Sequence, residues 1–347
     1  MRIQEPFKYL TISLTGLSLL ILVGCTTLRY VEIEELVPAD ITLPPGIQVI
    51  GIVNPHFQNG IDTTLSATTA DYLDENNLSS TDVMNAVLNG FRDVMDYSPR
   101  FFYMDIRNDG EIPNDTSDYI GLSGWEKIRQ VSHDSVLDAL VMVRLLDIVD
   151  NLYMTVEEDI DLELAGTIEV TGTWKLLDPV EMDVLDNFTS TFSSNTLSQT
   201  DYLELLFSMR SSRRRAVLDA CYVSGQEYAF RITPLWQTTG RKYYTWPGDV
   251  SKQAKEFVSQ EDWLSAARIW KSATSDSKRS ISAMACFNMA LACEIEDNLE
   301  MSLYWAKRSD TLQPYRIATQ DYIQLLDQRI KDRAKLDLQM EAGDGQK

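Results

Sequence analysis

Between residues 41 and 231, the spacing of the apolar residues alternates between strand-like and helix-like. Residues 47–53 and 100–106 are short β-branched and aromatic runs, and each is predicted to form a strand. Between them, apolar residues at helical spacing follow the capping sequence Ser80-Thr81-Asp82, which predicts a helix that extends to about Val94. A second, short helix is predicted near residues 124–130.

The most apolar of the strand candidates is residues 138–149, which we expect to form the central strand. Residues 162–176 alternate between apolar and polar, and residues 184–192 follow a turn at Asp178-Pro179 as a returning strand. A helix over about residues 200–223 closes this half. The order strand, helix, strand, helix and three strands predicts an α/β layer domain with a mixed sheet over residues 41–231.

The pattern changes after residue 231. Residues 232–250 concentrate aromatic side chains among prolines and glycines and are predicted to be a connector, whereas residues 251–347 are helical throughout. Ala266 and Ser302 occupy equivalent positions, 36 residues apart. This spacing resembles the tetratricopeptide repeat, a helical hairpin of about 34 residues. The fold class is therefore α+β: the α/β layer domain is followed by an all-α, tetratricopeptide-like domain.

Two hairpins alone would leave apolar faces open to solvent. We expect a terminal helix over about residues 319–340 to cap one end of the repeats and the α/β half to cover the other.

The N-terminus has the pattern of a lipoprotein signal peptide. Arg2 and Lys8 precede an apolar stretch over residues 9–23, which is too short to cross a bilayer as a finished helix. The stretch ends at Leu22-Val-Gly-Cys25, with small or aliphatic residues before the cysteine. We therefore predict a signal peptide over residues 1–24, lipidation of Cys25 and a tether over residues 25–40.

Charge and cysteine content narrow the function further. The formal net charge of the chain is −21, and loss of two basic residues and one acidic residue with the signal peptide makes it −22. Such a surface repels phosphate backbones, so we expect no nucleic-acid partner. The one basic cluster, over residues 210–215, is interpreted as a solvated helix face. Cys221, Cys286 and Cys293 are interpreted as buried small residues rather than a disulfide framework.

Several segments together resemble an uncharacterised family of Bacteroidetes-type outer-membrane lipoproteins, and the resemblance runs nearly end to end. The segments that carry it are Leu22–Cys25, Glu34–Asp40 with Leu43-Pro44, Trp174–Pro179, Gly225–Trp236, Arg241–Tyr244, Trp263–Trp270 and Phe287–Ala290. The resemblance implies no activity, because the family has no assigned role. Surface-exposed lipoproteins of this kind often carry an acidic run directly after the cysteine. Thr26-Thr-Leu-Arg29 stands there instead, which favours the periplasmic side of the outer membrane, although the cell surface stays open.

Few residues point to catalysis or to a cofactor. The only histidines are His56 and His133, so a histidine-rich zinc site is excluded. His133 lies beside Ser132, Asp134 and Ser135, but adjacent residues do not build a catalytic triad, and we interpret it as a histidine at a helix end or on the surface. His56 follows the first predicted strand, where ligands often bind in α/β folds. The segment Asp105–Gly110 fails the pattern of a calcium loop, because Arg107 and Thr116 occupy ligand positions. We expect no metal and no cofactor.

The aromatic residues of the predicted connector have two interpretations. They form an exposed platform for a sugar or peptide, or they pack the helical half onto the α/β half, which we favour because two repeats need a cover. The candidate partner-binding residues are Trp236, Tyr243, Tyr244, Trp246, Trp270 and Asn288.

Together these patterns predict a non-enzymatic adapter of the cell envelope, lipid-anchored to the outer membrane through Cys25, that binds an envelope protein. The alternatives are an envelope hydrolase, acting on glycans with acidic catalysts, and a spacer within a larger assembly. The sequence leaves the oligomeric state open.

Overall fold

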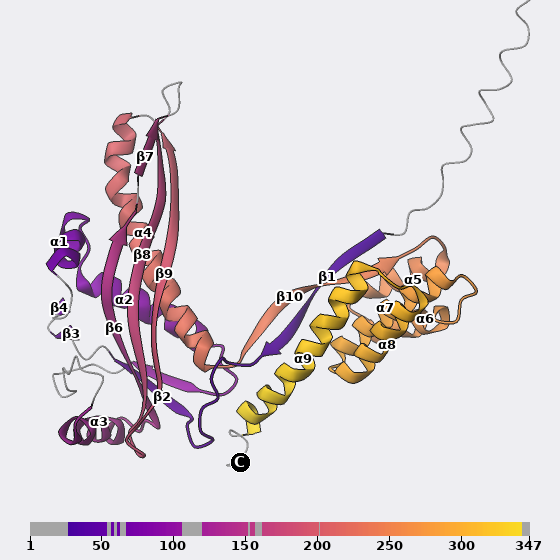
Figure 1. The fold of residues 1–347 in the computed structure, drawn as a ribbon, viewed down its shortest axis with the longest axis horizontal. Coiled ribbons are helices and arrows are strands. Elements are labelled where there is room, and N and C mark those ends of the chain that lie inside the picture. The colour runs from indigo at the N-terminus through magenta and orange to yellow at the C-terminus, as the bar shows by residue number, and fades with distance from the viewer. Residues whose placement is uncertain are drawn as a thin grey trace, which may run out of the picture. The chain divides into compact units, whose positions relative to one another are not determined.

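The computed structural model describes residues 27–53, 57–58, 61–62, 67–105, 120–151, 153–156, 162–200 and 202–341. The predicted signal peptide, Cys25, His56 and residues 106–110 of the calcium-like segment lie outside the described residues. The chain divides into two compact units (Figure 1). We call them the helical unit (residues 1–35 and 238–332) and the sheet unit (residues 36–237 and 333–347). None of the described helices is long and apolar enough to cross a membrane.

The sheet unit contains a mixed sheet, as the sequence predicts. Its strands are β2 (Val49–Val53), β5 (Phe102–Asp105), β6 (Ala139–Asp150), β7 (Tyr153–Val156), β8 (Leu162–Asp178) and β9 (Asp183–Thr200). Strand β2 pairs in parallel with β5 and β6, whereas β8 pairs antiparallel with β6, β7 and β9. A separate antiparallel pair is formed by β3 (Phe57–Gln58) and β4 (Ile61–Asp62).

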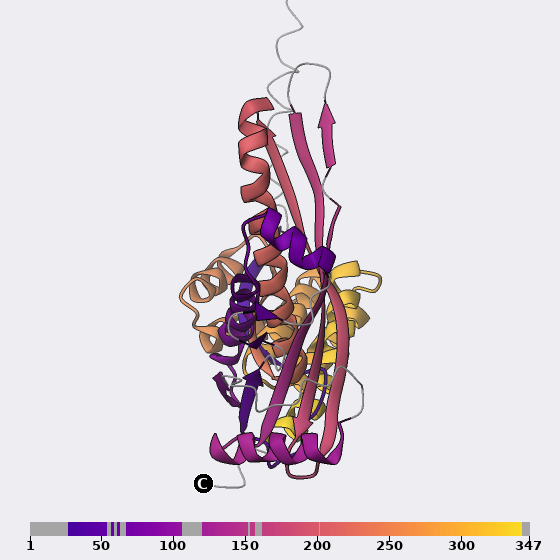
Figure 2. The same ribbon diagram turned by 90° about the vertical axis from the view of Figure 1, so that its left-hand side faces the viewer.

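Four helices accompany this sheet: α1 (Ala67–Glu75), α2 (Ser80–Met95), α3 (Leu122–Asp134) and α4 (Tyr202–Ile232). Alternate residues of β6 point to opposite faces, because Val141 and Val143 lie in the core on the side of α2 and α4 whereas Leu140 packs with Trp125 and Ile128 of α3. Figure 2 shows α3 across one end of the sheet. The centre of the larger core is Trp174, which stacks on Tyr228 of α4 with ring centroids 4.5 Å apart.

Helices α2 and α4 pack backbone against backbone. A Cβ atom at Gly90 would lie 1.9 Å from the carbonyl oxygen of Tyr222, and one at Gly225 would lie 2.0 Å from that of Val87. Glycine is required at both positions because any side chain would separate the helices. This contact also explains why α4 continues to Ile232, beyond the predicted end near residue 223: Gly225 serves helix packing and does not end the helix.

The helical unit consists of packed helix pairs, as predicted. The pairs are α5 (Asp249–Val258) with α6 (Trp263–Ala273) and α7 (Arg279–Ile295) with α8 (Leu299–Leu312). They are followed by α9 (Ile317–Glu341), of which residues 317–332 belong to this unit. Ala266 and Ser302 are both fully buried. Helices α6 and α8 begin in the same way, because the side chains of Asp262 and Asn298 accept hydrogen bonds from the backbone amides three residues on.

Two predicted irregular segments are strands. Residues 27–37, within the predicted tether, form β1 (Thr27–Val37), and most of the predicted connector is β10 (Leu235–Thr245). The two strands pair with each other. Thr27 and Thr245 share a hydroxyl–hydroxyl hydrogen bond of 2.7 Å although 218 residues separate them. A single sequence gives no local sign of such a distant partner, which is why the segment resembles a tether.

Candidate functional site

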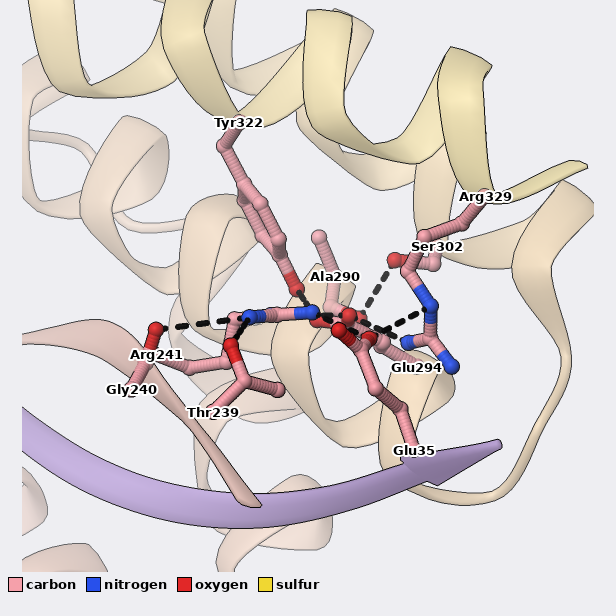
Figure 3. Close-up of polar contacts among 9 residues, drawn as sticks. All are labelled: Glu35, Thr239, Gly240, Arg241, Ala290, Glu294, Ser302, Tyr322 and Arg329. Carbon is pink, nitrogen blue, oxygen red and sulfur yellow. Dashed lines mark hydrogen bonds and ion pairs between the residues drawn. The ribbon is translucent and has the colours of Figure 1, made fainter. Parts of the chain in front are cut away.

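A buried network of charged side chains lies in the helical unit (Figure 3). It contains two acids and two bases, contributed by four different elements. Its members are Glu35 of β1, Arg241 of β10, Glu294 of α7, and Tyr322 and Arg329 of α9. We refer to these five residues as the charge network.

Glu35 and Arg241 reach the network because successive side chains of a strand point to opposite faces. Val31, Ile33 and Glu35 share one face of β1, on which Val31 packs against the core of the helical unit. On β10, Arg241 shares its face with Tyr243, and both are buried. Each strand therefore carries a charged residue at a position where its pattern calls for an apolar one.

The helices supply the remaining members. Glu294 lies near the end of α7, and its side chain is 0% exposed. Tyr322 and Arg329 are seven residues apart in α9, so they project from the same side of that helix, about 10 Å apart along its axis. The side chains converge on Glu294 from both sides.

Arg241 connects both carboxylates. Its Nε donates to Oε1 of Glu294 at 2.9 Å, and its Nη2 donates to Oε2 of Glu35 at 2.6 Å. The third nitrogen, Nη1, donates to the hydroxyl of Thr239 at 2.6 Å. Because its side chain is only 4% exposed, this complete set of partners offsets much of the cost of burying the guanidinium.

Arg329 and Tyr322 complete the network from α9. Arg329 lies 2.9 Å from Oε2 of Glu35 through Nε and also pairs with Oε1 of Glu294. The hydroxyl of Tyr322 donates to Oε2 of Glu294 at 2.5 Å. Burial, and then the negative charge of Glu294, raise the pKa of Tyr322 well above its ordinary value.

The arrangement of the charge network suits a structural role. Each carboxylate is bound by two guanidinium groups, and the formal charges of the two acids and the two bases cancel. What the network does is hold β1, β10, α7 and α9 together. Glu35, and with it the strand that begins two residues after Cys25, is thereby fixed to the helical unit.

A second contact holds β10 on α7. The side chain of Asn288, which is fully buried, accepts a hydrogen bond from the amide of Tyr244 and donates one to its carbonyl, both at 2.7 Å. The ring of Tyr244 packs edge-on against Phe287, with centroids 4.9 Å apart. This side of α7 is therefore covered by a strand of the same chain.

The six candidate partner-binding residues fall into two groups. Tyr243, Trp246, Trp270 and Asn288 are buried in the helical unit, and Tyr244 is half-buried against the same core. Their contacts are internal: Tyr243 packs on Trp270 with centroids 6.2 Å apart. Trp236, in the sheet unit, is 58% exposed and offers its ring to solvent. A partner-binding role for the six stays a prediction.

The other residues singled out from the sequence lie apart from the network. His133 is at the end of α3 with its side chain 87% exposed, as predicted, and its near neighbour is Asp134 at 3.3 Å. Cys221 and Cys286 are buried and Cys293 is half-buried, all as free thiols, and burial raises the pKa of Cys221 to about 12. In the basic cluster, Arg213 is not simply solvated, because its Nε lies 2.7 Å from Asp150 of β6.

Sequence reasoning did not identify the charge network. Two signals for it were present. Glu294 is an acid inside the most apolar of the described helices, and Glu35 interrupts the apolar phase set by Val31 and Ile33. Neither signal names its partners, because these lie up to 294 residues away, as Arg329 does from Glu35.

The fold and the network together define an α+β protein in which a mixed-sheet unit accompanies a unit of helix pairs closed by its own two strands. Residues 47–244, more than half of the chain, match the model of a family described as a domain of unknown function (DUF8603). Residues 252–328 match a second domain of unknown function (DUF6340). The chain therefore belongs to the DUF8603 family. Among curated proteins, none is similar to it in sequence.

The chain is also similar, at low sequence identity, to several solved structures. A PelC dodecamer from Paraburkholderia phytofirmans is 9% identical, with a TM-score of 0.27 over 60% of this chain and 98% of that one. A putative neuraminyllactose-binding hemagglutinin homologue from Helicobacter pylori is 11% identical, with a TM-score of 0.27 over 55% of this chain and 91% of that one. A hypothetical protein from Chlamydia trachomatis is 9% identical, with a TM-score of 0.21 over 53% of this chain and 98% of that one.

Proposed function

We propose that this chain is a lipid-anchored, non-catalytic protein of the cell envelope that binds a partner protein along the free edge of β9. The anchor is Cys25, directly after the signal peptide predicted from the sequence. The outer membrane, with the protein facing the periplasm, is the location that the residues after Cys25 favour.

The observation that carries the binding role is the composition of β9. Among the described strands, β8 is the one that pairs with β9, so the other edge of β9 carries backbone amides and carbonyls without a strand partner (Figure 1). Residues 187–200 of this strand contain no charged residue, no proline and no glycine, in a chain of net charge −21. Natural proteins usually protect such edges with lysine, proline or bulges. An unprotected edge is a template for another chain, which adds a strand through main-chain hydrogen bonds.

The side chains on the solvent face of β9 also suit pairing. Thr189 and Thr191 are exposed and bond to Thr173 and Thr171 of β8, with hydroxyl oxygens 3.1 Å and 2.8 Å apart. Hydroxyl ladders of this kind extend to a further strand without adding charge. The absence of charge lets another acidic envelope protein approach β9 without the repulsion that the rest of the surface exerts.

Two observations support a non-catalytic role. The carboxylates of the charge network are neutralised by Arg241 and Arg329, which leaves them unsuited to acid–base work. His133, which the sequence places beside two serines and an aspartate, stands in solvent at a helix end. A triad requires its members to converge in a protected site.

The test is cross-linking in living cells that express the tagged full-length chain, followed by purification under denaturing conditions and mass spectrometry. Thr191→Lys and Thr171→Lys form a matched pair, because each removes the same hydroxyl–hydroxyl bond and adds one positive charge to the same face of the sheet. Only the first places that charge on the edge strand. Cys25→Ala serves as the unanchored control.

A reproducible set of envelope proteins that is recovered with the wild type and Thr171→Lys, and lost with Thr191→Lys and Cys25→Ala, is the expected result. An identical set from both lysine variants would rule out the β9 edge as the binding surface. Recovery of abundant bystanders alone would rule out the partner-binding role.

A further inference from the structure

The distance between the lipid anchor and the first strand is short. Only Thr26 separates Cys25 from β1, which begins at Thr27, so the Cα atoms of Cys25 and Thr27 lie at most about 7 Å apart. Since β1 is paired with β10 and held by Glu35, the chain has no slack there to lift the helical unit from the bilayer. The residues that surround Thr27 in the helical unit are therefore held at the depth of the lipid headgroups.

A series of hydrogen bonds defines those surroundings. Thr27 bonds to Thr245 at the end of β10, with the two hydroxyl oxygens 2.7 Å apart. The next residue, Trp246, donates its amide to the hydroxyl of Ser251 at 2.9 Å, which fixes the first turn of α5 beside the end of β10. The anchor end of β1, the end of β10 and the start of α5 thus form one small surface.

This surface has a charge opposite to that of the chain as a whole. Among the charged side chains of residues 27–30 and 242–255 there are four bases and one acid, for a net charge of +3, against −21 for the chain. The bases are Arg29, Lys242, Lys252 and Lys255, and the acid is Asp249. Further along β1, the exposed charges are Glu32 and Glu34. The net charge of the paired strands β1 and β10 therefore changes along their length, from positive beside the anchor to negative farther from it.

Apolar and amphipathic side chains accompany the cations. Val250 is 42% exposed in the first turn of α5, and Tyr30 is 69% exposed, with the ammonium of Lys242 lying 5.7 Å from the centre of its ring. Tyrosine and lysine together are typical of surfaces at the membrane interface, because each combines an apolar body with a polar end.

We propose that the end of the β1–β10 pair nearest the lipid, which has Arg29 and Tyr30 on its two faces and includes Lys242, Val250 and Lys252, rests directly on phospholipid headgroups, with its cations beside the phosphates. We call this end the anchor-side surface. The proposal rests on lipidation of Cys25, which belongs to the proposed function. It deepens that function, because a basic surface beside the anchor attracts anionic headgroups and so fixes how the anchored protein is oriented on the membrane. The paired strands β1 and β10 then stand upright on the bilayer, and Glu32 and Glu34 lie farther from it than Arg29.

The test uses the acylated full-length protein in vesicles of phosphatidylethanolamine and phosphatidylglycerol at about 3:1. A fluorescent label is attached at Val250→Cys or, as a control, at Glu34→Cys, in a Cys293→Ser background because Cys293 is the half-buried native thiol. Glu34 is exposed and lies seven residues beyond Thr27, about 23 Å along the strand. Quenching by lipids that carry a nitroxide on the headgroup reports contact with the interface, and flotation of the vesicles reports anchoring.

We expect flotation of both labelled proteins and quenching at Val250 that exceeds quenching at Glu34 by about threefold or more. Lys242→Glu with Lys252→Glu should abolish that difference without loss of flotation. Lys278→Glu with Lys331→Glu, which makes the same change of charge at exposed positions outside the anchor-side surface, should leave it intact.

Two results would overturn the proposal, and they are distinguishable. Flotation with equally weak quenching at both labels would mean that the anchor holds but the surface does not touch lipid. Failure of the wild-type protein to float would mean that Cys25 is not acylated, and the anchoring part of the proposed function would be lost as well.

Discussion

Arg241 of β10 and Glu294 of α7 form an ion pair inside the helical unit, with Nε 2.9 Å from Oε1, although 53 residues separate them in the chain. Glu35 and Arg329 make the same kind of contact at 2.9 Å beside it. The second pair connects the first strand to the last helix. The network thus turns a segment that looks like a tether into part of the helical unit.

Breaking the buried pair should be costly. Arg241→Met leaves the buried carboxylate of Glu294 with one guanidinium fewer, so we expect the free energy of unfolding to fall by about 3–5 kcal/mol. Urea unfolding followed by tryptophan fluorescence measures this, because Trp246 and Trp270 lie in the same core.

The double variant Arg241→Met/Glu294→Met should lose less than the sum of the two single variants, by about 1–3 kcal/mol. Arg333→Ala, in an exposed pair with Asp337, is the control and should change stability by less than about 1 kcal/mol. Equal effects at Arg241 and Arg333 would contradict the role of the network.

Asn288 should tolerate no change that removes either of its two hydrogen bonds to Tyr244. Asn288→Ala leaves the amide and carbonyl of Tyr244 without their partner, and we expect a loss of about 2–4 kcal/mol, about 1–2 for each bond. Asn288→Asp keeps the acceptor but places a negative charge against the carbonyl, so it should be at least as harmful as alanine. If Asn288→Asp were as stable as the wild type, the donor side of this contact would be irrelevant.

The contact between α2 and α4 should admit no methyl group. Gly225→Ala would place Cβ 2.0 Å from a backbone carbonyl oxygen, so the helices must separate and part of the core around Trp174 must open. We expect a loss of more than about 3 kcal/mol, or failure to fold. Gly46→Ala is the control, because no atom lies within 4 Å of the added carbon, and it should be close to neutral. Thermal unfolding followed by circular dichroism compares the two.

Alkaline pH should weaken the helical unit through Tyr322. Its pKa is raised in the folded state by burial and by Glu294, so the fold favours the protonated phenol. The associated stability is complete below the unfolded pKa of about 10 and is lost as the pH rises above that value toward the folded pKa. Tyr322→Phe loses the hydrogen bond at neutral pH but should show a shallower decline of the melting temperature between about pH 9 and 11. An identical decline in both proteins would assign the effect to other groups.

Much of the fold follows from local pattern. The spacing of apolar residues correctly predicts the strands over residues 47–53 and 138–149 and the helix that begins at Ser80. The spacing is informative because burial of one face imposes a period of two residues on a strand and of 3.6 residues on a helix. The repeat identified from Ala266 and Ser302 is likewise local, since each hairpin packs on its neighbour in sequence.

The parts that were not predictable depend on distant partners. Strand β1 is stabilised by β10, more than 200 residues away, and its own sequence of alternating acids and aliphatic residues does not distinguish a paired strand from a tether. From the sequence, the aromatic residues near Tyr243 have two interpretations, a binding platform or internal packing, and only their contacts with Trp270 and Phe287 show how they pack. Glu294 and Arg241 acquire their role only from each other.

The most direct test of the central claim, that β1 belongs to the helical unit, is amide hydrogen exchange over residues 28–35 in the full-length protein. We predict that these amides exchange about 100-fold or more slowly than an unstructured chain, with protection comparable to that of β10, and that Glu35→Ala removes most of it while α7 stays protected. Exchange at the rate of an unstructured chain in the wild type, with α7 protected, would contradict the claim and restore residues 25–40 as a tether.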